Sequence, residues 1–319
     1  MNPLTSFRDR GRVAALTLLT ALAPLVWGTT YAVSSEMLPG GHPLFTGTVR
    51  ALPAGLVAVA IGTALPRGSW WWKSAVLGFL NIGLFFPMLF ITAERLPGGM
   101  AGTLGSVGPL IVALVAVPLL GIRLSRWRLG WGTAGVIGVG LVVLGPAARP
   151  DPLGIAAGLV GASSMALGVT LTKRWGRPDG VGPVALVGWQ LSAGGLFLVP
   201  VTLIIEGAPP AIDGRASLGY LWLGLVGGLI AYILYFSGVG KLPVSSVATL
   251  NLLSPMVAAT VGIAVLGESL APVQLLGLLV ALASVVAGQF SPPTRRPRRP
   301  DLSAPVPSRS VASTLAHIP

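Results

Sequence analysis

Long apolar runs recur along the whole chain and decide what it can fold into. A bilayer core about 30 Å thick requires roughly 20 apolar residues per helix. Only 9% of the residues are charged, far below the share of about 25% in soluble domains, so the chain cannot cover itself with a water-exposed surface. The sequence predicts an all-helical integral membrane protein whose ten transmembrane helices lie near residues 13–34, 45–65, 71–93, 98–121, 129–144, 153–172, 184–205, 218–239, 244–266 and 273–290.

The first apolar run shares features with a secretory signal peptide. Arg8, Arg10 and Arg12 precede it, and residues 21–23 resemble a cleavage site. A signal peptide has an apolar core of about 7–15 residues, and this run continues well beyond that length. We therefore expect an uncleaved first helix.

Basic residues are distributed unevenly between the two sides of the predicted bundle. Both tails and the even-numbered connections hold most of them, whereas the other connections hold Arg95, Arg149 and Arg215. Short loops rich in Lys and Arg stay in the cytoplasm, so we expect a multi-pass cell-membrane protein with both termini cytoplasmic. Residues 1–12 form the N-terminal segment, and residues 291–319 are too polar and basic to fold alone. The excess of arginine over lysine indicates a G+C-rich genome and hence a bacterial inner membrane.

The chain lacks the side chains for several kinds of chemistry. It has no cysteine, and its histidines are His42 and His317, so Cys/His zinc sites and the H-E-x-x-H motif are excluded. No nucleotide-binding G-x-x-x-x-G-K-[ST] loop is present. The net charge of +12 is scattered between apolar runs, which does not predict nucleic-acid binding. We expect no enzyme, metal or cofactor; the expected partners are the lipid bilayer and a small-molecule substrate, and a monomer suffices, although the oligomeric state is left open.

The two halves of the chain resemble each other. A shift of 146 places Pro109 on Pro255, and a shift of 140 earlier in each half places Thr30 on Thr170. Five helices is an odd number, so the second half enters the membrane from the opposite face. Inverted repeats of this kind build transporters with a binding site at the repeat interface. We expect one repeat at 13–148 and another at 149–290. The same shifts align Leu96-Pro97 with Leu242-Pro243, and Gly55-Leu56 with Gly195-Leu196.

At these residues the chain resembles the EamA family of the drug/metabolite transporter superfamily. Residues 27–31 (Trp-Gly-Thr-Thr-Tyr) look like the first-helix motif of that family, and residues 266–272 (Leu-Gly-Glu-Ser-Leu-Ala-Pro) look like its signature at the end of the second repeat. The first repeat departs from that signature, because Ile122 and Arg123 stand where the second repeat has Glu268 and Ser269. The resemblance implies two five-helix repeats and efflux or exchange of a small organic solute, such as an amino acid or related metabolite.

Arg50 is the clearest charge inside a predicted span. An ionisable group within a membrane is costly and marks a pathway or a buried partner. A guanidinium can bind a substrate carboxylate or phosphate through two parallel hydrogen bonds. The alternatives are that Arg50 extends to the interface or pairs with Glu36 as a brace. The residue in the repeat-equivalent position, Gln190, is neutral, so an anion site here would be asymmetric.

Other polar and aromatic residues lie deep in their spans and are candidates for lining a substrate cavity. The competing interpretation of Trp and Tyr is an interfacial belt, and that of Asn is hydrogen bonding between helices. Tyr235 is a further candidate beside Tyr232. The expected substrate-binding set is Trp27, Thr30, Tyr31, Arg50, Asn81, Thr170, Trp189, Gln190, Tyr232 and Asn251.

We predict a secondary transporter that works by alternating access. Each Asp and Glu lies near a helix end, with Glu36 and Glu94 the nearest to a span, so both proton exchange and uncoupled transport remain open. The main alternative is an exporter of multiple drugs or quaternary cations, which would require an acidic group deep in the cavity. A passive channel and a lipid-handling membrane protein are further alternatives.

Overall fold

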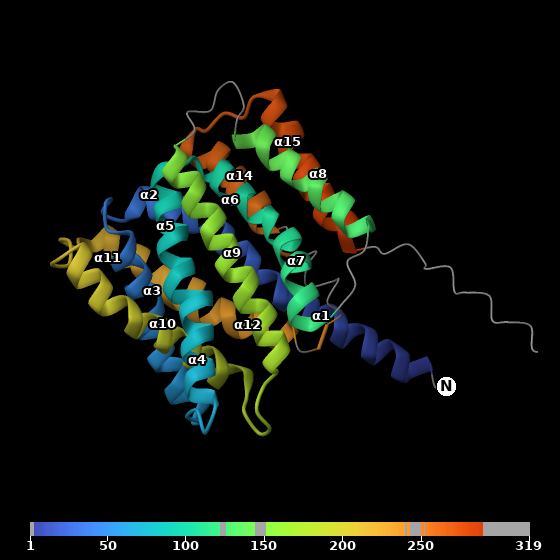
Figure 1. Cartoon of the computed structure of the whole chain (residues 1–319), viewed down its shortest axis with the longest axis vertical. Helices are drawn as coiled ribbons and strands as arrows, with labels where there is room; N and C mark the ends of the chain where they lie inside the picture. The colour runs from blue at the N-terminus through green and yellow to red at the C-terminus, as the bar shows by residue number, and fades with distance from the viewer. Residues whose placement is uncertain are drawn as a thin grey trace, which may run out of the picture.

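The computed structural model describes residues 3–121, 126–143, 151–239, 241–242, 250–251 and 253–289. Within these residues every regular element is a helix and no strand occurs. The helices pack side by side in a bundle (Figure 1). A helical bundle suits a bilayer because each helix satisfies its backbone hydrogen bonds internally.

Several long helices are divided into consecutive pieces by local changes of helix type or by a single turn residue. Thr29 separates the first two pieces, and π-helical segments interrupt two later helices. The elements are α1 (Pro3–Gly28), α2 (Thr30–Met37), α3 (Pro43–Gly62), α4 (Trp70–Gly78), the π-helical η1 (Phe79–Leu84), α5 (Phe85–Arg95), α6 (Gly98–Leu104), the 3₁₀-helical η2 (Gly105–Val107), α7 (Gly108–Leu120), α8 (Arg126–Val143), α9 (Pro152–Trp175), α10 (Pro183–Ile205), α11 (Gly214–Leu221), the π-helical η3 (Trp222–Ile230), α12 (Ala231–Val239), α14 (Leu253–Leu266) and α15 (Pro272–Gln289).

Seven helical stretches of the described chain are long and apolar enough to cross a membrane, and three shorter apolar helices accompany them. The predicted span at 244–266 lies partly outside the described residues, as do the ends of the spans at 129–144 and 273–290. The seven long stretches are Val13–Met37, Pro43–Gly62, Trp70–Arg95, Gly98–Leu120, Pro152–Trp175, Pro183–Ile205 and Gly214–Gly238, and the three shorter helices are Leu129–Val142, Leu253–Leu266 and Pro272–Ala287.

Glycines bring α3 and α10 into close contact. A Cβ atom on Gly55 would collide with the backbone of Ser192, and one on Gly195 would lie 2.8 Å from the Cα atom of Leu52. Small residues allow helix backbones to approach closely, which is how packing is achieved where lipid removes the hydrophobic driving force. The α3–α10 contact therefore joins the two halves of the chain closely.

A second glycine-mediated pair joins α8 and α15, which lie side by side in Figure 1. A Cβ atom on Gly138 would lie 2.6 Å from the carbonyl oxygen of Gly277, and one on Gly277 would lie 2.6 Å from the carbonyl oxygen of Gly138. The contact is therefore reciprocal. Two helices far apart in sequence share one tightly packed interface.

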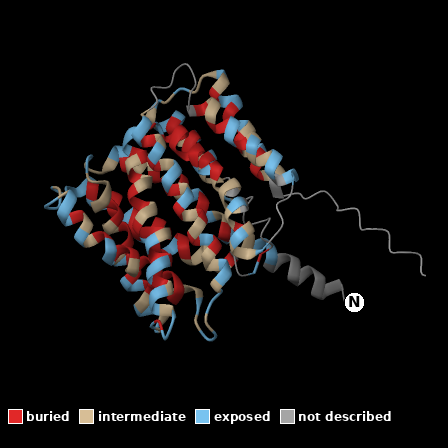
Figure 2. Cartoon of the chain, in the orientation of Figure 1, coloured by how far each residue is buried: buried red, intermediate tan, exposed pale blue. Residues whose placement is uncertain are grey.

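Buried residues gather on the inward faces of the helices, and exposed residues line the outward faces (Figure 2). Many of the exposed side chains are large and apolar, including Leu18, Ile61 and Ile204. An apolar exterior of this extent is unfavourable in water and suited to lipid. The bundle thus has an outer surface made for the bilayer.

Carboxylates close one end of the bundle by binding helix N-termini. Glu206, after α10, accepts hydrogen bonds of 2.7 and 2.8 Å from the backbone N–H groups of residues 44–45 at the start of α3. Glu268, after α14, accepts bonds of 2.7 and 3.2 Å from residues 98–99 at the start of α6. A carboxylate at a helix N-terminus satisfies unpaired N–H groups and the helix dipole.

Two exposed ion pairs lie at the same end. Arg95 contacts Asp151 at 3.0 Å, and Arg215 contacts Glu36 at 3.2 Å. Asp151 also caps α9, and its hydrogen bond from the Gly154 N–H, followed by that from Arg95, holds the pKa of this carboxyl below its usual range. Exposed pairs contribute little stability individually, so the two partly buried helix-end contacts of Glu206 and Glu268 carry more of the closure.

Candidate functional site

Arg50 is buried in the bundle, and no carboxylate of the described residues pairs with it. It lies on α3 with only 2% of its surface exposed. Its guanidinium carbon is 4.6 Å from the ring centroid of Phe86 and 5.8 Å from that of Phe90, both on α5. Within the described part of the chain, Nε and Nη1 have no hydrogen-bond partner. Aromatic faces attract the cation, but they leave these N–H donors unsatisfied.

The surroundings of Arg50 decide between the interpretations of this residue. Glu36 pairs with Arg215, so the expected alternative of an Arg50–Glu36 brace is wrong. Burial also excludes extension of the side chain to the interface in this conformation. Among the described residues, the ionisable side chains close enough to interact with the guanidinium are Tyr232 and Tyr31. The guanidinium therefore lies near the side chains of phenylalanine and tyrosine residues.

An aromatic group stands beside Arg50. Trp27 makes an edge contact with Tyr232 and a tilted contact with Tyr235, with ring centroids 5.2 and 5.0 Å apart. The indole N–H of Trp27 donates a 2.9 Å hydrogen bond to the carbonyl of Gly227 in the π-helical segment η3. Gly227 in turn approaches Arg50, because a Cβ atom placed on it would lie 3.7 Å from Nη2. The first helix and η3 therefore meet at the guanidinium.

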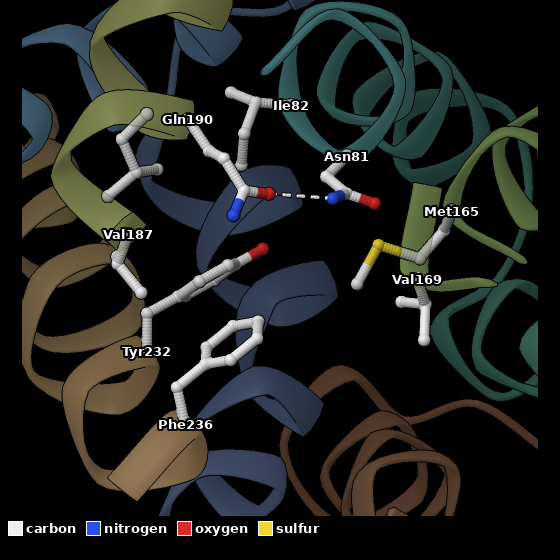
Figure 3. Close-up of a pocket in the computed structure, with 9 residues that line it drawn as sticks. Asn81, Ile82, Met165, Val169, Val187, Gln190, Tyr232 and Phe236 are labelled. Carbon is white, nitrogen blue, oxygen red and sulfur yellow. Dashed lines mark hydrogen bonds between the residues drawn. The ribbon is translucent and has the colours of Figure 1, made fainter. Parts of the chain in front are cut away.

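A pair of buried amides forms the other polar part of the centre. Nδ2 of Asn81, in the π-helical segment η1, donates a 2.7 Å hydrogen bond to Oε1 of Gln190 on α10. Oδ1 of Asn81 is buried without a partner among the described residues. In Figure 3 the hydroxyl of Tyr232 points toward this amide pair, with Met165 on the other side. These residues line a cavity of about 10 Å³, room for about one water molecule.

One apolar cluster connects these two polar parts. Phe86 and Phe90 beside Arg50, Ile82 beside Asn81, and Tyr232 belong to the same set of buried residues, and Trp27 packs against it. We call Trp27, Arg50, Asn81, Gln190 and Tyr232 the central site. A low-dielectric environment strengthens any hydrogen bond that a solute makes there.

The remaining expected residues lie at or beyond the edge of the central site. The Tyr31 hydroxyl donates to the carbonyl of Ala101 at 3.4 Å, and Asn251 donates to the Tyr235 hydroxyl at 2.8 Å. Thr30 is buried, and the Thr170 hydroxyl bonds to the carbonyl of Ala166 on its own helix at 2.7 Å.

Trp189 is placed apart from the central site. Its indole N–H donates a 2.7 Å hydrogen bond to the carbonyl of Ala64, and its ring lies 6.2 Å from that of Trp70. Both contacts are near helix ends. Trp189 resembles a helix-end anchor more than a cavity residue.

Several residues of the centre were absent from the sequence-based set. Phe86, Phe90, Phe236 and Met165 have no feature that separates them from the many other apolar residues in the spans. Gly227 does have such a signal, because the shift of 146 places Asn81 on it. Gly227 occupies the position in the second half that the polar Asn81 occupies in the first half, so the two halves differ there.

A helical bundle with a lipid-suited exterior and a buried polar centre defines a membrane protein with an internal binding site. The sequence model of the EamA-like transporter family matches residues 15–144 and 152–287. The chain belongs to this family. It is a membrane transporter and not an enzyme, in agreement with its relatives, which are named as transporters.

Individual relatives agree with this assignment. Protein PecM of Dickeya dadantii (strain 3937) is 40% identical over 267 residues, which cover 84% of this chain and 90% of that protein. The uncharacterized inner membrane transporter YedA of Escherichia coli (strain K12) is 27% identical, with 82% and 86% covered. A solved crystal structure matches with a TM-score of 0.62 at 20% identity, covering 86% of this chain and 95% of its own, which shows a shared fold.

Proposed function

We propose that this chain is a secondary transporter that exports or exchanges small organic solutes, such as amino acids or related metabolites, across the cytoplasmic membrane of a bacterium. The observation that carries the proposal is Arg50, which is buried and has two N–H donors without partners among the residues that the structure describes. A buried charge of this kind is costly unless it is used. A substrate carboxylate would supply the missing acceptors and the missing counter-charge.

The proposed architecture has ten membrane helices in two inverted five-helix repeats, with both termini cytoplasmic. Support comes from the two matches of the family model, one in each half, and from reciprocal helix contacts. The shift of 140 exchanges Gly55 with Gly195 and Leu52 with Ser192, and these residues form the two equivalent contacts of the α3–α10 interface. Such reciprocity is what a two-fold axis between the repeats requires.

The proposed mechanism is alternating access with the outer end closed in this conformation. In the proposed topology Glu206, Glu268 and the two ion pairs lie on the outer side, and each of the four contacts joins the first repeat to the second. The cavity at the centre holds no more than about one water. A solute therefore reaches the central site only after helices separate, and the four contacts are the ones that outward opening breaks.

Counterflow in proteoliposomes tests the proposed function. The full chain is reconstituted, loaded with amino acids, organic acids or cationic drugs, and assayed for exchange of labelled solute. The variant is Arg50→Gln, which removes the charge and keeps hydrogen-bonding capacity. Arg67→Gln is the matched control, because this arginine is exposed in the connection between α3 and α4, away from the central site and from the four contacts.

Wild type and Arg67→Gln are expected to show saturable counterflow of carboxylate-bearing solutes, and Arg50→Gln is expected to lose it by about tenfold or more, the effect of one or two charge-assisted hydrogen bonds. Linear, unsaturable flux indicates a channel. No flux with a folded protein contradicts the transport assignment.

A cation exporter is the second candidate, because the rings of Trp27, Tyr232 and Tyr235 lie together and aromatic groups bind quaternary ammonium ions. Arg50 stands beside them and repels a cation. Exchange of the cationic drugs alone, unaffected by Arg50→Gln, is the result that would establish this candidate and overturn the first.

A further inference from the structure

The two π-helical segments occupy equivalent positions in the two halves of the chain. The shift of 146 carries η1 (Phe79–Leu84) onto residues 225–230, the last part of η3 (Trp222–Ile230). π-helical segments are rare and often occur at functional sites. The same shift places Asn81 on Gly227, so each segment contributes one residue to the centre of the bundle.

The partners of these two residues are also equivalent. Asn81 bonds to Gln190, and Gly227 faces Arg50; the shift of 140 places Arg50 on Gln190. Their neighbours repeat the pattern, because a Cβ atom on Gly78 would meet the carbonyl of Gln190 and one on Gly224 would lie 3.9 Å from the carbonyl of Arg50. The two halves thus contain equivalent junctions. The first consists of the amides of Asn81 and Gln190, and the second of Gly227 and the guanidinium of Arg50.

The difference between the two junctions determines which hydrogen-bonding atoms are free. In the first junction the amides bond to each other, and Oδ1 of Asn81 has no partner within the described part of the chain. In the second junction Gly227 lies beside Nη2 and has no side chain to bond to Arg50, and Nε and Nη1 have no partner among the described residues. All three atoms are buried, so a complementary ligand would gain fully from pairing with them.

We infer that Gly227 and Asn81 determine the substrate class: Gly227 leaves the Arg50 guanidinium free for an oxyanion, and Oδ1 of Asn81 accepts a hydrogen bond from an N–H or O–H group of the same solute. This inference rests on the proposed function. The substrate class is a small solute that carries a carboxylate or phosphate and, elsewhere, a hydrogen-bond donor. The aromatic rings around the central site favour an apolar body between the two groups.

The experiment compares binding and transport of four matched probes. L-Phenylalanine carries both groups, 3-phenylpropionate lacks the ammonium donor, phenylalaninamide lacks the carboxylate, and phenyl phosphate replaces carboxylate with phosphate. Binding is measured as the ligand-induced rise in Tm of the purified full chain, and transport as counterflow. Wild type is expected to prefer an oxyanion probe over phenylalaninamide, and preference for either oxyanion supports the inference.

Gly227→Asn places an amide beside Arg50 and is expected to weaken binding of the oxyanion probes about tenfold. Gly227→Ala tests the position with less risk to folding, because its Cβ atom would come no closer than 3.6 Å to another atom; a smaller loss in the same direction is expected. Gly224→Ala, which adds a methyl group one turn away against the backbone of Val49, is the control and is expected to retain the preference for oxyanion probes.

Asn81→Leu is expected to remove the advantage of phenylalanine over 3-phenylpropionate in binding.

The double variant Arg50→Gln/Gly227→Asn rebuilds the amide pair in the second half and is expected to bind phenylalaninamide and 3-phenylpropionate about equally. Unchanged oxyanion preference in both folded Gly227 variants overturns the inference even if wild type transports. Selective oxyanion binding that Gly227→Asn abolishes, without counterflow by wild type, supports the inference and removes the transport assignment. Absence of oxyanion preference in wild type overturns the inference.

Discussion

Arg50 shows how a single residue can be unfavourable for folding and still belong to the structure. Its cation lies against the rings of Phe86 and Phe90, and two of its donors have no partner among the described residues. Cation–π contacts recover part of the lost hydration, but an unpaired buried charge still costs several kcal/mol, of the order found for buried ions. A residue with this balance is expected to bind a ligand, and its replacement should separate the effect on stability from the effect on activity.

Arg50→Met therefore has opposite expected effects on stability and on transport. Methionine fills a similar volume without a charge, so the Tm of the purified protein is expected to stay the same or rise by about a few degrees. Counterflow is expected to disappear. Thermal unfolding with parallel flux assays checks both. A clear fall in Tm would show that the guanidinium holds the fold together and would remove the argument that it awaits a ligand.

The sequence predicted the position of some individual residues in the bundle and not of others. Depth in a span identified Arg50, Asn81 and Gln190, because a polar group there is rare. Depth did not distinguish Trp27, which lies at the centre, from Trp189, which anchors a helix end at Ala64. Both are tryptophans within a span, and the helix face that each occupies depends on packing that hydropathy does not record.

The bounds of the helices were largely predictable from the sequence, whereas the contacts at their ends were not. Hydropathy predicted a helix at 71–93, and the structure has a helical stretch from Trp70 to Arg95, but no property of the apolar sequence revealed the π-helical segment within it. The acidic residues were predicted to lie near helix ends, and Glu206 and Glu268 do so. Their partners, the N-termini of α3 and α6, are distant in sequence and emerge only from the tertiary structure.

The helix-end contacts can be ranked by mutation. Glu206→Ala leaves the backbone N–H groups of Leu44 and Phe45 without acceptors, an expected loss of about 1–3 kcal/mol and hence of several degrees in Tm. Glu36→Ala removes an ion pair whose side chains are 62% and 52% exposed and is expected to change Tm little. Thermal unfolding of both variants makes the comparison. Equal losses would refute the assignment of Glu206 as the principal contact at the start of α3.

At the scale of the whole molecule, the lipid-suited exterior and the helical class followed from composition alone, because 9% charge leaves no alternative to lipid. The expected repeats guided the assignment of equivalent positions, and the reciprocal contacts of α3 with α10 fit the shift of 140. The sequence did not predict which conformation the structure adopts. The four inter-repeat contacts at one end, and the small central cavity, describe a closed arrangement that the proposed mechanism must open.

The most direct test of that mechanism is to lock this end and measure flux. The chain has no cysteine, so Gly98→Cys and Glu268→Cys introduce the sole thiols, at positions where a Cβ atom on residue 98 would lie 3.6 Å from Oε1 of Glu268. A short, reducible bifunctional thiol reagent joins them, and Asp213→Cys/Ala216→Cys at the start of α11 is the control pair. Alternating access predicts that counterflow stops when residues 98 and 268 are joined, returns on reduction, and continues in the control. Undiminished counterflow with the two residues joined would contradict it.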